Sequence, residues 1–517
     1  MVARLLGIDS GGTMTKVALF DDVGNEIACE HSPNRIQFPH AGWTERDPDG
    51  MWRAACEGIR TLLEKTGTSP GDIAAVTAVG YGAGLYFVDA DGRVVRPGIG
   101  STDTRSAETI ALWEETGLKS DLESAIQQAV WAGQSLPILG WFEQHQPDVL
   151  DRTRHLLLCK DFLRFRLCGD ISTDPTDAGC AGFADVSKGC YATDAFIAAG
   201  LVDCIEKLPE IGASTDIAGY VTAEAAAQTG LLEGTPVCRG VYDVVACSLA
   251  SGLTRADELG VVAGTFSINS RLYTAPSLDP LPTLQVAYPL EGKYLATMAG
   301  ATSASNLEWV CSTLLAAEAD VARRNGRSIY EVCSDLVESA IDRDCGILFF
   351  PYVFGGPSGA PAGLLGVQAG SQLPDVLRAV FEGIVFAHCQ DIGYLLGKSG
   401  TDGIRRVLLS GGPSKSPVWS QIFCDALNLP LVVANGSEFG AKGAAMCASV
   451  GVGMQPDLTS AISAMTRISR THTPDPDRVE VLKARYRRYS EVGERLAAAW
   501  VPHTAPDCAS SYVGASA

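Results

Sequence analysis

The stretch "LLGIDSGGTMTKVALFDDVG" (residues 5–24) decides the fold, because two apolar runs in it flank a glycine-rich bend. Residues 5–8 and 17–20 each have the composition of a buried strand, and residues 22–24 form a turn signal that predicts a hairpin. The sequence between the two runs, Asp-Ser-Gly-Gly-Thr at residues 9–13, therefore lies at a tight bend.

This bend has the side chains of a phosphate site. Gly11 and Gly12 leave backbone amides uncovered, so an anion can approach them closely. Thr13 adds a hydroxyl and Lys16 adds a cation. Asp9 would repel phosphate unless a metal ion lay between them, so the bend predicts a nucleotide-phosphate site with Mg²⁺. A glycine-rich hairpin in an ordinary sheet remains the alternative for the bend taken alone.

The composition limits the class of protein. A chain of 517 residues is too long for one ordinary core, so we expect two or three domains. The formal net charge of −20 argues against nucleic acid or an anionic membrane as the main partner. No apolar run reaches membrane-spanning length and no signal peptide is visible, which favours a cytoplasmic protein. The 16 cysteines lack the paired spacing of zinc sites, so we expect reduced, buried thiols.

Strand-like and helical runs alternate along the chain, which predicts an α/β architecture. Residues 258–274, "ELGVVAGTFSINSRLYT", repeat the logic of the opening stretch, with a strand, a turn of small residues and a second strand. We therefore expect two similar lobes, at residues 1–252 and 253–500, with a cleft between them. Residues 477–500 predict an amphipathic closing helix, and residues 501–517 predict a flexible tail.

Glycine turns follow strand-like runs at two further places. Gly264 and Thr265 offer amides and a hydroxyl from the second lobe, and Gly411 and Gly412 stand between a strand-like run and a helix. A helix N-terminus at this point suits a nucleotide. If the lobes face each other, the three turns hold one phosphate chain from both sides of the cleft.

A carboxylate interrupts the apolar run "CRGVYDVVACSLASG" (residues 238–252) at Asp243. A buried carboxylate costs free energy unless it is paired or used. Two interpretations are open: Asp243 caps the helix that follows, or it is a general base that accepts the proton of a hydroxyl attacking the γ-phosphate.

Polar and aromatic side chains gather in the loops "AGWTERDPDGMW" (residues 41–52), "STDTRSAE" (101–108) and "AVWAGQS" (129–135). Trp43, Asp103, Trp131 and Gln134 are the side chains that suit a polyhydroxylated ligand, whose hydroxyls need donors and acceptors while its C–H faces stack on rings. Helix caps and turns explain each loop individually, with Asp47 as the cap of a helix over residues 47–66.

Taken together, the motifs resemble those of the FGGY carbohydrate kinases, in the sugar kinase/actin/Hsp70-like ATPase superfamily. The resemblance extends from residue 5 to about residue 500. It includes, in order, "GIDSGGTMTK", "GWTERD", "STDTR", "CKDFLRFRLCGDISTDPTDAG", "GVYDVVACSLASG", "AGTFS", "GATSASNLEW", "FFPYVFG" and "SGGPSKSPVWSQIFCD". Within the family, the chain looks most similar to the L-xylulose kinases of the xylulokinase-like branch.

The resemblance implies two RNase H-like lobes, the first binding the sugar and carrying the base, the second binding the nucleotide. It makes Asp243 the catalytic base and lets Asp9 hold Mg²⁺ through water. The phosphates of ATP would be held by Gly11, Gly12, Thr13 and Lys16, with Gly264 and Thr265 opposite. The adenosine would be held by Gly411, Gly412, Ser416 and Trp419. The sugar would be contacted by Trp43, Tyr81, Asp103, Trp131 and Asp243.

Three positions depart from the family pattern. Position 12 is Gly where many relatives have Thr, and position 81 is Tyr where L-xylulose kinases have Gln. Because the side chain at position 81 should border the sugar, the substrate can differ. Lys442 places a charge where an apolar residue is commoner.

The expected activity is ATP-dependent phosphorylation of a terminal hydroxyl on a small ketose, with L-xylulose or a related pentulose or 3-keto-L-gulonate as the first candidates. D-xylulose, L-ribulose and four-carbon polyols such as erythritol are rival acceptors. A non-catalytic nucleotide-driven switch and a sugar-sensing pseudokinase are alternatives of a different class. A homodimer is common among relatives and is compatible with the sequence.

Overall fold

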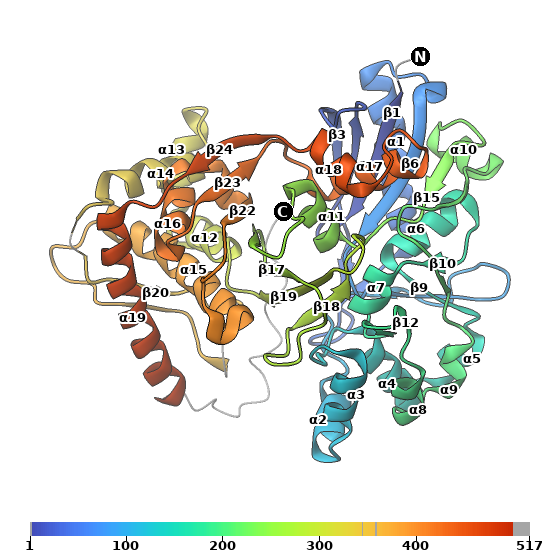
Figure 1. The fold of residues 1–517 in the computed structure, drawn as a ribbon, viewed down its shortest axis with the longest axis horizontal. Helices are drawn as coiled ribbons and strands as arrows, with labels where there is room; N and C mark the ends of the chain where they lie inside the picture. Colours follow the sequence, from blue (N-terminus) through green and yellow to red (C-terminus); the bar gives the residue numbers. More distant parts are fainter. Residues whose placement is uncertain (1–2, 344, 357–358, 500–517) are drawn as a thin grey trace.

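The computed structural model describes residues 3–343, 345–356 and 359–499, and within these ranges two large mixed sheets are surrounded by helices (Figure 1). The sheet of the first half has the strand order β14 (Ile217–Tyr220), β15 (Pro236–Cys238), β6 (Ile73–Gly80), β1 (Arg4–Ser10), β2 (Met14–Phe20), β3 (Glu26–Pro33). The sheet of the second half has the order β18 (Leu284–Ala287), β19 (Tyr294–Gly300), β17 (Ser267–Tyr273), β16 (Glu258–Ala263), β22 (Arg406–Gly411), β23 (Leu431–Ala434), β24 (Ile468–His472).

The two sheets repeat one topology. In the first half β1 pairs antiparallel with β2, β2 pairs antiparallel with β3, and β6 and β15 continue the sheet in parallel with β1. In the second half β16, β17 and β19 form the antiparallel part, and β22 and β23 form the parallel part. The α/β fold with two similar lobes is therefore confirmed.

Helices cover both faces of the first sheet. One face packs on α1 (Pro48–Thr66), α6 (Cys159–Cys168) and α10 (Ala223–Thr229). The predicted start of α1 is confirmed, because Asp47 accepts a hydrogen bond from the Asp49 amide at 3.0 Å and Pro48 takes the first helical position. Gly67, at φ 63°, ends the helix in the left-handed conformation that favours glycine.

The other face packs on helices from both halves of the chain. These helices are α11 (Asp243–Ser251), α17 (Phe439–Gly451) and α18 (Leu458–Met465), the last two reaching the blue strands of the first half in Figure 1. A side chain at Gly7 of β1 would collide with the carbonyl oxygen of Ala441, so the helix and strand approach very closely. The same core contains Leu272 and Leu408 of the second sheet, so α11 and α17 join the two sheets.

A second core lies on the far face of the second sheet. The helices that form it are α12 (Ser305–Trp309), α14 (Ile329–Ala340), α15 (Leu373–Leu396), α16 (Pro417–Leu427) and α19 (Pro476–Ala499), and α13 (Ala316–Arg324) packs beside α14. The last of these is the predicted closing helix. The prediction for residues 501–517 lies outside the described residues.

A third, smaller sheet inserted in the first half carries the polar loops. Its strand order is β4 (Ile36–Gln37), β5 (Glu45–Arg46), β8 (Gly98–Ile99), β7 (Leu85–Val88), β9 (His155–Leu158). Its helices are α2 (Ala107–Glu115), α3 (Leu118–Ile126), α4 (Ser135–His145), α5 (Pro147–Arg152), α8 (Thr193–Ala198) and α9 (Val202–Ile205). The helix α7 (Pro175–Cys180) joins this smaller sheet region to the core that the two large sheets share, where it packs on β18.

Two predictions from composition can be compared with the described part of the chain. Every cysteine there is a free thiol, and most are buried as expected, but Cys190 is exposed and Cys29, Cys168, Cys247 and Cys345 are half-buried. Its helices all lack the combination of length and apolar composition that crossing a bilayer requires.

Candidate functional site

Asp9 is the next-to-last residue of β1 and lies beside the first turn of α17. Its Oδ1 atom is buried without a hydrogen-bond partner, and a side chain at Gly440 would collide with its Oδ2 atom. Burial raises the pKa of the Asp9 carboxyl to about 6, although the charge of Lys16 lowers it. A buried carboxylate oxygen with no partner suits a hard cation, so the residues present fit Mg²⁺.

Lys16 pairs with a carboxylate in this conformation. Its Nζ atom lies 2.8 Å from Oε2 of Glu438, and Nε2 of His31 lies 3.1 Å from Oε1 of the same side chain. Ligand atoms of Cys29, His31 and Glu438 lie within 4.8 Å of one another, but the Lys16 ammonium on this carboxylate disfavours a second cation there. The role of Lys16 toward phosphate stays a prediction, and it requires the ammonium to leave Glu438 or to bridge both anions.

Arg46 holds the glycine bend through hydrogen bonds from its guanidinium group. Its guanidinium donates to Oγ of Ser10 at 3.0 Å, to Oγ1 of Thr15 at 3.1 Å and to the carbonyl oxygen of Gly11 at 3.3 Å. Gly12 and Thr13 of the same bend are exposed to solvent. This support of the bend by Arg46 was not predicted; the available signal was a cation in the loop "GWTERD" together with a predicted anion site.

Asp243 is the first residue of α11, and Tyr242 takes the N-cap position that was the alternative for Asp243. Its Oδ1 atom accepts from the amide of Val244 at 2.7 Å. Burial, followed by the charge of Asp9, raises the pKa of the Asp243 carboxyl to about 7. The two carboxylates are therefore close enough to influence each other, and a pKa near neutrality suits a general base.

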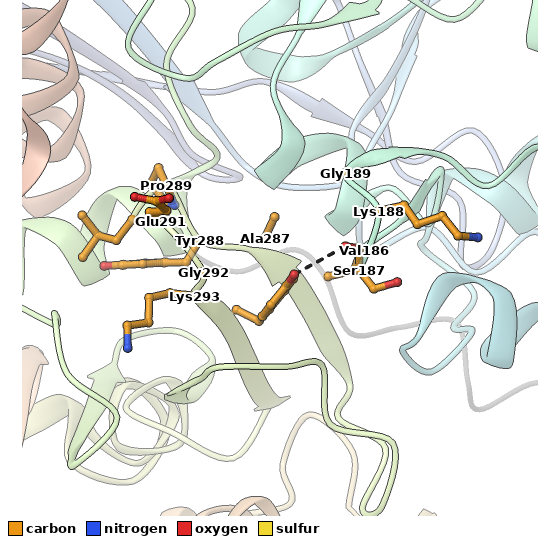
Figure 2. Close-up of a pocket in the computed structure, with 12 residues that line it drawn as sticks. Val186, Ser187, Lys188, Gly189, Ala287, Tyr288, Pro289, Glu291, Gly292 and Lys293 are labelled. Atoms are coloured by element: carbon orange, nitrogen blue, oxygen red, sulfur yellow. Dashed lines mark hydrogen bonds between the residues drawn. The ribbon is translucent and has the colours of Figure 1, made fainter.

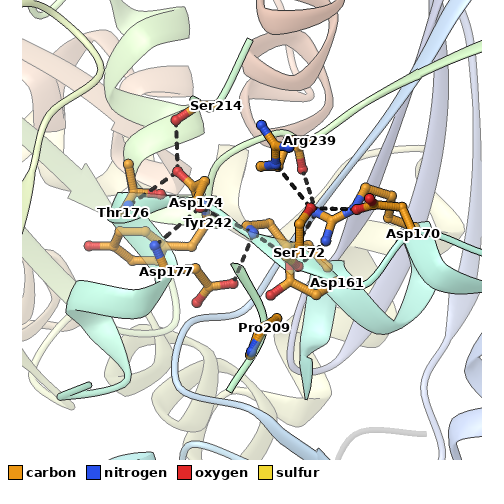
Figure 3. Close-up of polar contacts among 12 residues, drawn as sticks. Asp161, Asp170, Ser172, Asp174, Thr176, Asp177, Pro209, Ser214, Arg239 and Tyr242 are labelled. Carbon is orange, nitrogen blue, oxygen red and sulfur yellow. Dashed lines mark hydrogen bonds and ion pairs between the residues drawn. The ribbon is translucent and has the colours of Figure 1, made fainter. Parts of the chain in front are cut away.

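A buried network of charges lies beside Tyr242, the residue before Asp243 (Figure 3). Lys160 Nζ lies 2.5, 3.1 and 3.7 Å, respectively, from carboxylate oxygens of Asp161, Asp174 and Asp177. Both carboxylate oxygens of Asp177 lack hydrogen-bond partners, and burial raises the pKa of this carboxyl well above its ordinary value. This network was not predicted from the sequence; the available signal was Lys160, Asp161 and Arg164 among the apolar residues of α6.

The loops predicted to contact a polyhydroxylated ligand are joined by hydrogen bonds. Ser106 Oγ donates to the carbonyl oxygen of Ala132 at 2.7 Å, and Ser135 Oγ donates to that of Ala83 at 3.0 Å. A side chain at Gly82 would meet the ring of Tyr242 at 2.8 Å, directly before Asp243. The structure thus brings residues 82–83, 101–106 and 131–135 together, and Gly82 lies against the ring of the residue that precedes Asp243, which sequence separation alone did not show.

Two of the residues predicted to contact the sugar, Asp103 and Trp43, already interact with other side chains. Asp103 is fully buried, and its oxygens are taken by Arg105 at 2.8–2.9 Å and by the amide of Thr44 at 2.7 Å. Trp43 faces the same guanidinium, with its ring centroid 3.9 Å from Cζ. These contacts hold the loops, and a role of either residue toward the sugar stays a prediction.

Tyr81 and Trp131 form a contrast. The Tyr81 hydroxyl lies 2.9 Å from that of Tyr86, and the Tyr81 ring packs in the core beneath α1 and α6. The indole Nε1 of Trp131 is buried without a partner. The Tyr81 hydroxyl is therefore already hydrogen-bonded, so nothing supports the expected contact of this side chain with the sugar. The Trp131 indole, in contrast, has an N–H donor without a partner.

The two glycine turns of the second half lie beside each other. Gly411 has φ 88°, and a side chain there would collide with the carbonyl oxygen of Ala263, immediately before Gly264. No atom lies within 4 Å of a side chain built on Gly264, and Thr265 is exposed. Gly412 is also exposed, so both turns present an open backbone.

The helix after Gly412 begins later than expected. A short 3₁₀ turn, η5 (Gly412–Lys415), comes first, and Ser416 then caps α16 by accepting from the amide of Trp419 at 3.2 Å. The Trp419 indole is only 3% exposed and stacks on Phe381 with 4.2 Å between centroids. It is a core side chain, so a contact of this residue with adenosine would have to come from the backbone.

A separate hollow of about 350 Å³ lies between residues 186–189 and 287–294 (Figure 2). Tyr294 donates from its hydroxyl to the carbonyl oxygen of Ser187 at 3.4 Å across it. Neither Asp9 nor Asp243 lines this hollow, so we assign no catalytic role to it.

Comparison with known proteins covers nearly the whole chain. Residues 4–250 match the FGGY family of carbohydrate kinases, N-terminal domain, and residues 260–452 match its C-terminal domain. The "Probable L-xylulose kinase" of Pasteurella multocida is 32% identical over 95% of this chain and 99% of its own length. The "L-xylulose/3-keto-L-gulonate kinase" of Escherichia coli is 28% identical over 95% and 97%. The solved xylulose kinase of Rhodospirillum rubrum superposes with a TM-score of 0.83 at 26% identity, covering 95% of this chain and 99% of that one.

Proposed function

Because the chain belongs to the FGGY family of carbohydrate kinases, we propose that it transfers the γ-phosphoryl group of ATP to a terminal hydroxyl of a small ketose. L-xylulose, a related pentulose or 3-keto-L-gulonate is the acceptor that the names of the relatives favour. D-xylulose, L-ribulose and four-carbon polyols such as erythritol are the alternatives. The observation that carries the proposal is the pairing of two carboxylates, the buried Asp9 at the glycine bend and the half-buried Asp243 at the start of α11, close enough for the charge of one to raise the pKa of the other.

Each half has a proposed share in the reaction. Residues 1–252 bind the sugar and supply the base, and residues 253–500 bind the nucleotide through the turns at Gly264 and Gly411. Asp243 orients the acceptor hydroxyl and takes its proton as the new P–O bond forms and the bond to ADP breaks. Mg²⁺ held through Asp9 would supply neutralisation of the β- and γ-phosphate oxygens.

Most of the rate gain is then expected from positioning, because phosphoryl transfer leaves little covalent work for a protein. The turns at Gly11–Thr13 and Gly264–Thr265 would fix the phosphates through backbone amides. Exclusion of water from the site around Asp9 and Asp243 would limit hydrolysis of ATP.

A kinase screen tests the proposal. ADP release is measured at fixed ATP and Mg²⁺ over pentuloses, hexulosonates and tetritols, and NMR of the product locates the phosphate. Sugar-dependent ADP release supports a kinase. ATP turnover that no sugar stimulates would favour the nucleotide-driven switch, and sugar binding without turnover would favour the sensor.

A further inference from the structure

Two cysteine thiols in the core of the second half face each other. The Sγ atom of Cys311 lies 3.8 Å from that of Cys333, and the two residues are 3% and 0% exposed. Cys311 belongs to η2 (Val310–Leu314), a turn of π-helix that continues from α12, and Cys333 belongs to α14. The contact between the sulfur atoms therefore depends on how these two helical segments pack.

The segment that carries Cys311 is a surface turn. The three residues that follow it, 312–314, are exposed, whereas the Cys311 thiol points into the core. A single turn of π-helix is an irregular element, and such turns are frequent at functional sites. Local opening of this one turn is enough to bring a small solute to the pair of thiols, because a surface turn opens at a lower free energy than the whole fold.

The two thiols differ in reactivity. The hydrogen bond between them lowers the pKa of the Cys333 thiol and raises the pKa of the Cys311 thiol. The thiolate is the form that attacks an oxidant, so Cys333 is the better nucleophile of the two. Cys311 is then the neighbouring thiol that converts the first oxidation product into a disulfide.

The segment before Cys311 holds one of the glycine turns that we propose to bind ATP. The main-chain N–H of Ala304 donates to the carbonyl oxygen of Gly264 at 3.0 Å, and Ser305 Oγ donates to that of Thr265 at 2.8 Å. These contacts lie at the start of α12, which continues directly into η2. A movement of η2 therefore reaches the turn at residues 264–265.

The helix that carries Cys333 reaches the other nucleotide turn. The next residue, Ser334, donates from its hydroxyl to Oγ of Ser416 at 2.9 Å. Ser416 caps α16 directly after η5, the turn that begins at Gly412. A disulfide needs about 2 Å between its sulfur atoms, so its formation must move η2, α14 or both side chains. Such a movement affects the supports of both turns.

We propose that Cys311 and Cys333 form a redox modification site, at which an oxidant of the peroxide class makes a disulfide that weakens nucleotide binding. The effect on ATP rests on the proposed kinase function, whereas formation of the disulfide does not.

The chemistry takes two steps. The Cys333 thiolate attacks one oxygen of hydrogen peroxide, the O–O bond breaks, and a sulfenic acid and, after protonation, one water result. The Cys311 sulfur then attacks the sulfenic sulfur, the S–O bond breaks, and the hydroxyl leaves with the Cys311 proton as a second water. The two thiols lose two electrons in total, and the peroxide gains them.

The first test asks whether the disulfide forms in the unmodified protein. The protein is treated with hydrogen peroxide, the remaining thiols are alkylated, and tryptic peptides are analysed by mass spectrometry without reduction. Cys311 and Cys333 are each the one cysteine of their peptides, residues 294–323 and 328–343, so a link between these peptides identifies the pair. We expect the linked peptides to appear and to be separated by dithiothreitol. Alkylation of both thiols, or their oxidation without this link, overturns the proposal.

The second test measures ATP binding by calorimetry in the reduced and oxidised protein. We expect the Kd for ATP to rise about 10-fold on oxidation and to recover after dithiothreitol. Cys311→Ala and Cys333→Ala, each compared with its own reduced form, should lose this response, and Cys190→Ala, at an exposed cysteine, should keep it.

The outcomes separate the two proposals. A linked pair with an unchanged Kd, or a response that persists in both core variants, overturns the control of nucleotide binding by this site. A reduced protein that binds no ATP overturns the proposed kinase function instead, and the peptide map still decides whether the disulfide forms.

Discussion

The glycine turns of the two halves occupy matching places in matching sheets, but their surroundings differ. The turn after β1 is bordered by charged side chains: Asp9, Lys16, Arg46 and Glu438. The turn after β16 is bordered by Ala263, Phe266 and Ala304, with main-chain bonds from Gly264 to Phe266 and Ala304. One scaffold thus presents a charged turn in the first half and an uncharged turn in the second. Substitutions should affect turnover in the first half and nucleotide affinity or stability in the second.

The largest effect is expected at Asp243. Asp243→Asn removes the proton acceptor while keeping the size of the side chain, so kcat should fall about 10³-fold. ATP binding, measured by calorimetry, and the melting temperature should stay near those of the parent protein. Asp203→Asn, at an exposed position, serves as the control. Near-normal turnover of Asp243→Asn would assign the base to another group.

Asp9→Asn should lower kcat about 10²-fold and raise the Mg²⁺ concentration needed for half-maximal activity, because a charged ligand of the cation is lost. A titration of Mg²⁺ at saturating ATP and sugar measures both changes. An unaltered Mg²⁺ requirement would move the metal away from the first half and weaken the contrast between the turns.

The pH profile examines the coupling of the two carboxylates. Asp243 must be ionised to accept a proton, so kcat/KM should decline as the pH falls through about 7. The charge of Asp9 contributes to this raised pKa, so the midpoint should move to lower pH in Asp9→Asn. An identical midpoint in both proteins would show that the carboxylates titrate independently.

In the second half, we expect substitutions to act by disturbing the backbone conformation of the glycine turns. Gly411→Ala places a side chain at φ 88° against Ala263, so we expect the free energy of unfolding to fall by about 2–3 kcal/mol and KM for ATP to rise. Gly12→Ala meets no atom within 4 Å and should change stability by less than about 1 kcal/mol. Urea unfolding of the two variants measures the difference, and equal losses would contradict it.

The smallest effect is expected in the helix that both halves share. Lys442 of α17 is 2% exposed, with its Nζ 3.3 Å from the carbonyl oxygen of Asn435, and burial lowers its pKa to about 8. The unfolded chain binds this proton more tightly, so the group destabilises the fold below pH 8 and ceases to do so as the pH rises toward about 10. Lys442→Leu should increase the free energy of unfolding by about 1–2 kcal/mol at pH 7 and have little effect near pH 10. Equal changes at both pH values would exclude this cause.

The sequence allowed prediction of the fold and of the three glycine turns, because strand periodicity and glycine position are local signals. It did not reveal that Trp419 and Tyr81 have buried rings, since an aromatic residue near a site motif gives no information about the direction of its side chain. The pairing of Lys16 with Glu438 and the network around Lys160 depend on residues far apart in the chain. Such contacts become visible only when the packing of α17 and α7 is known.

The close approach of α17 to β1 affects the way this protein emerges from the ribosome. The first strand is synthesised early, whereas the helix that covers its inner face leaves the exit tunnel only when most of the chain has been translated. Until then the apolar face formed by Leu5, Ala18 and Phe20 lacks this cover. Native assembly of the first sheet therefore finishes late, and the growing chain should depend on chaperones during that interval.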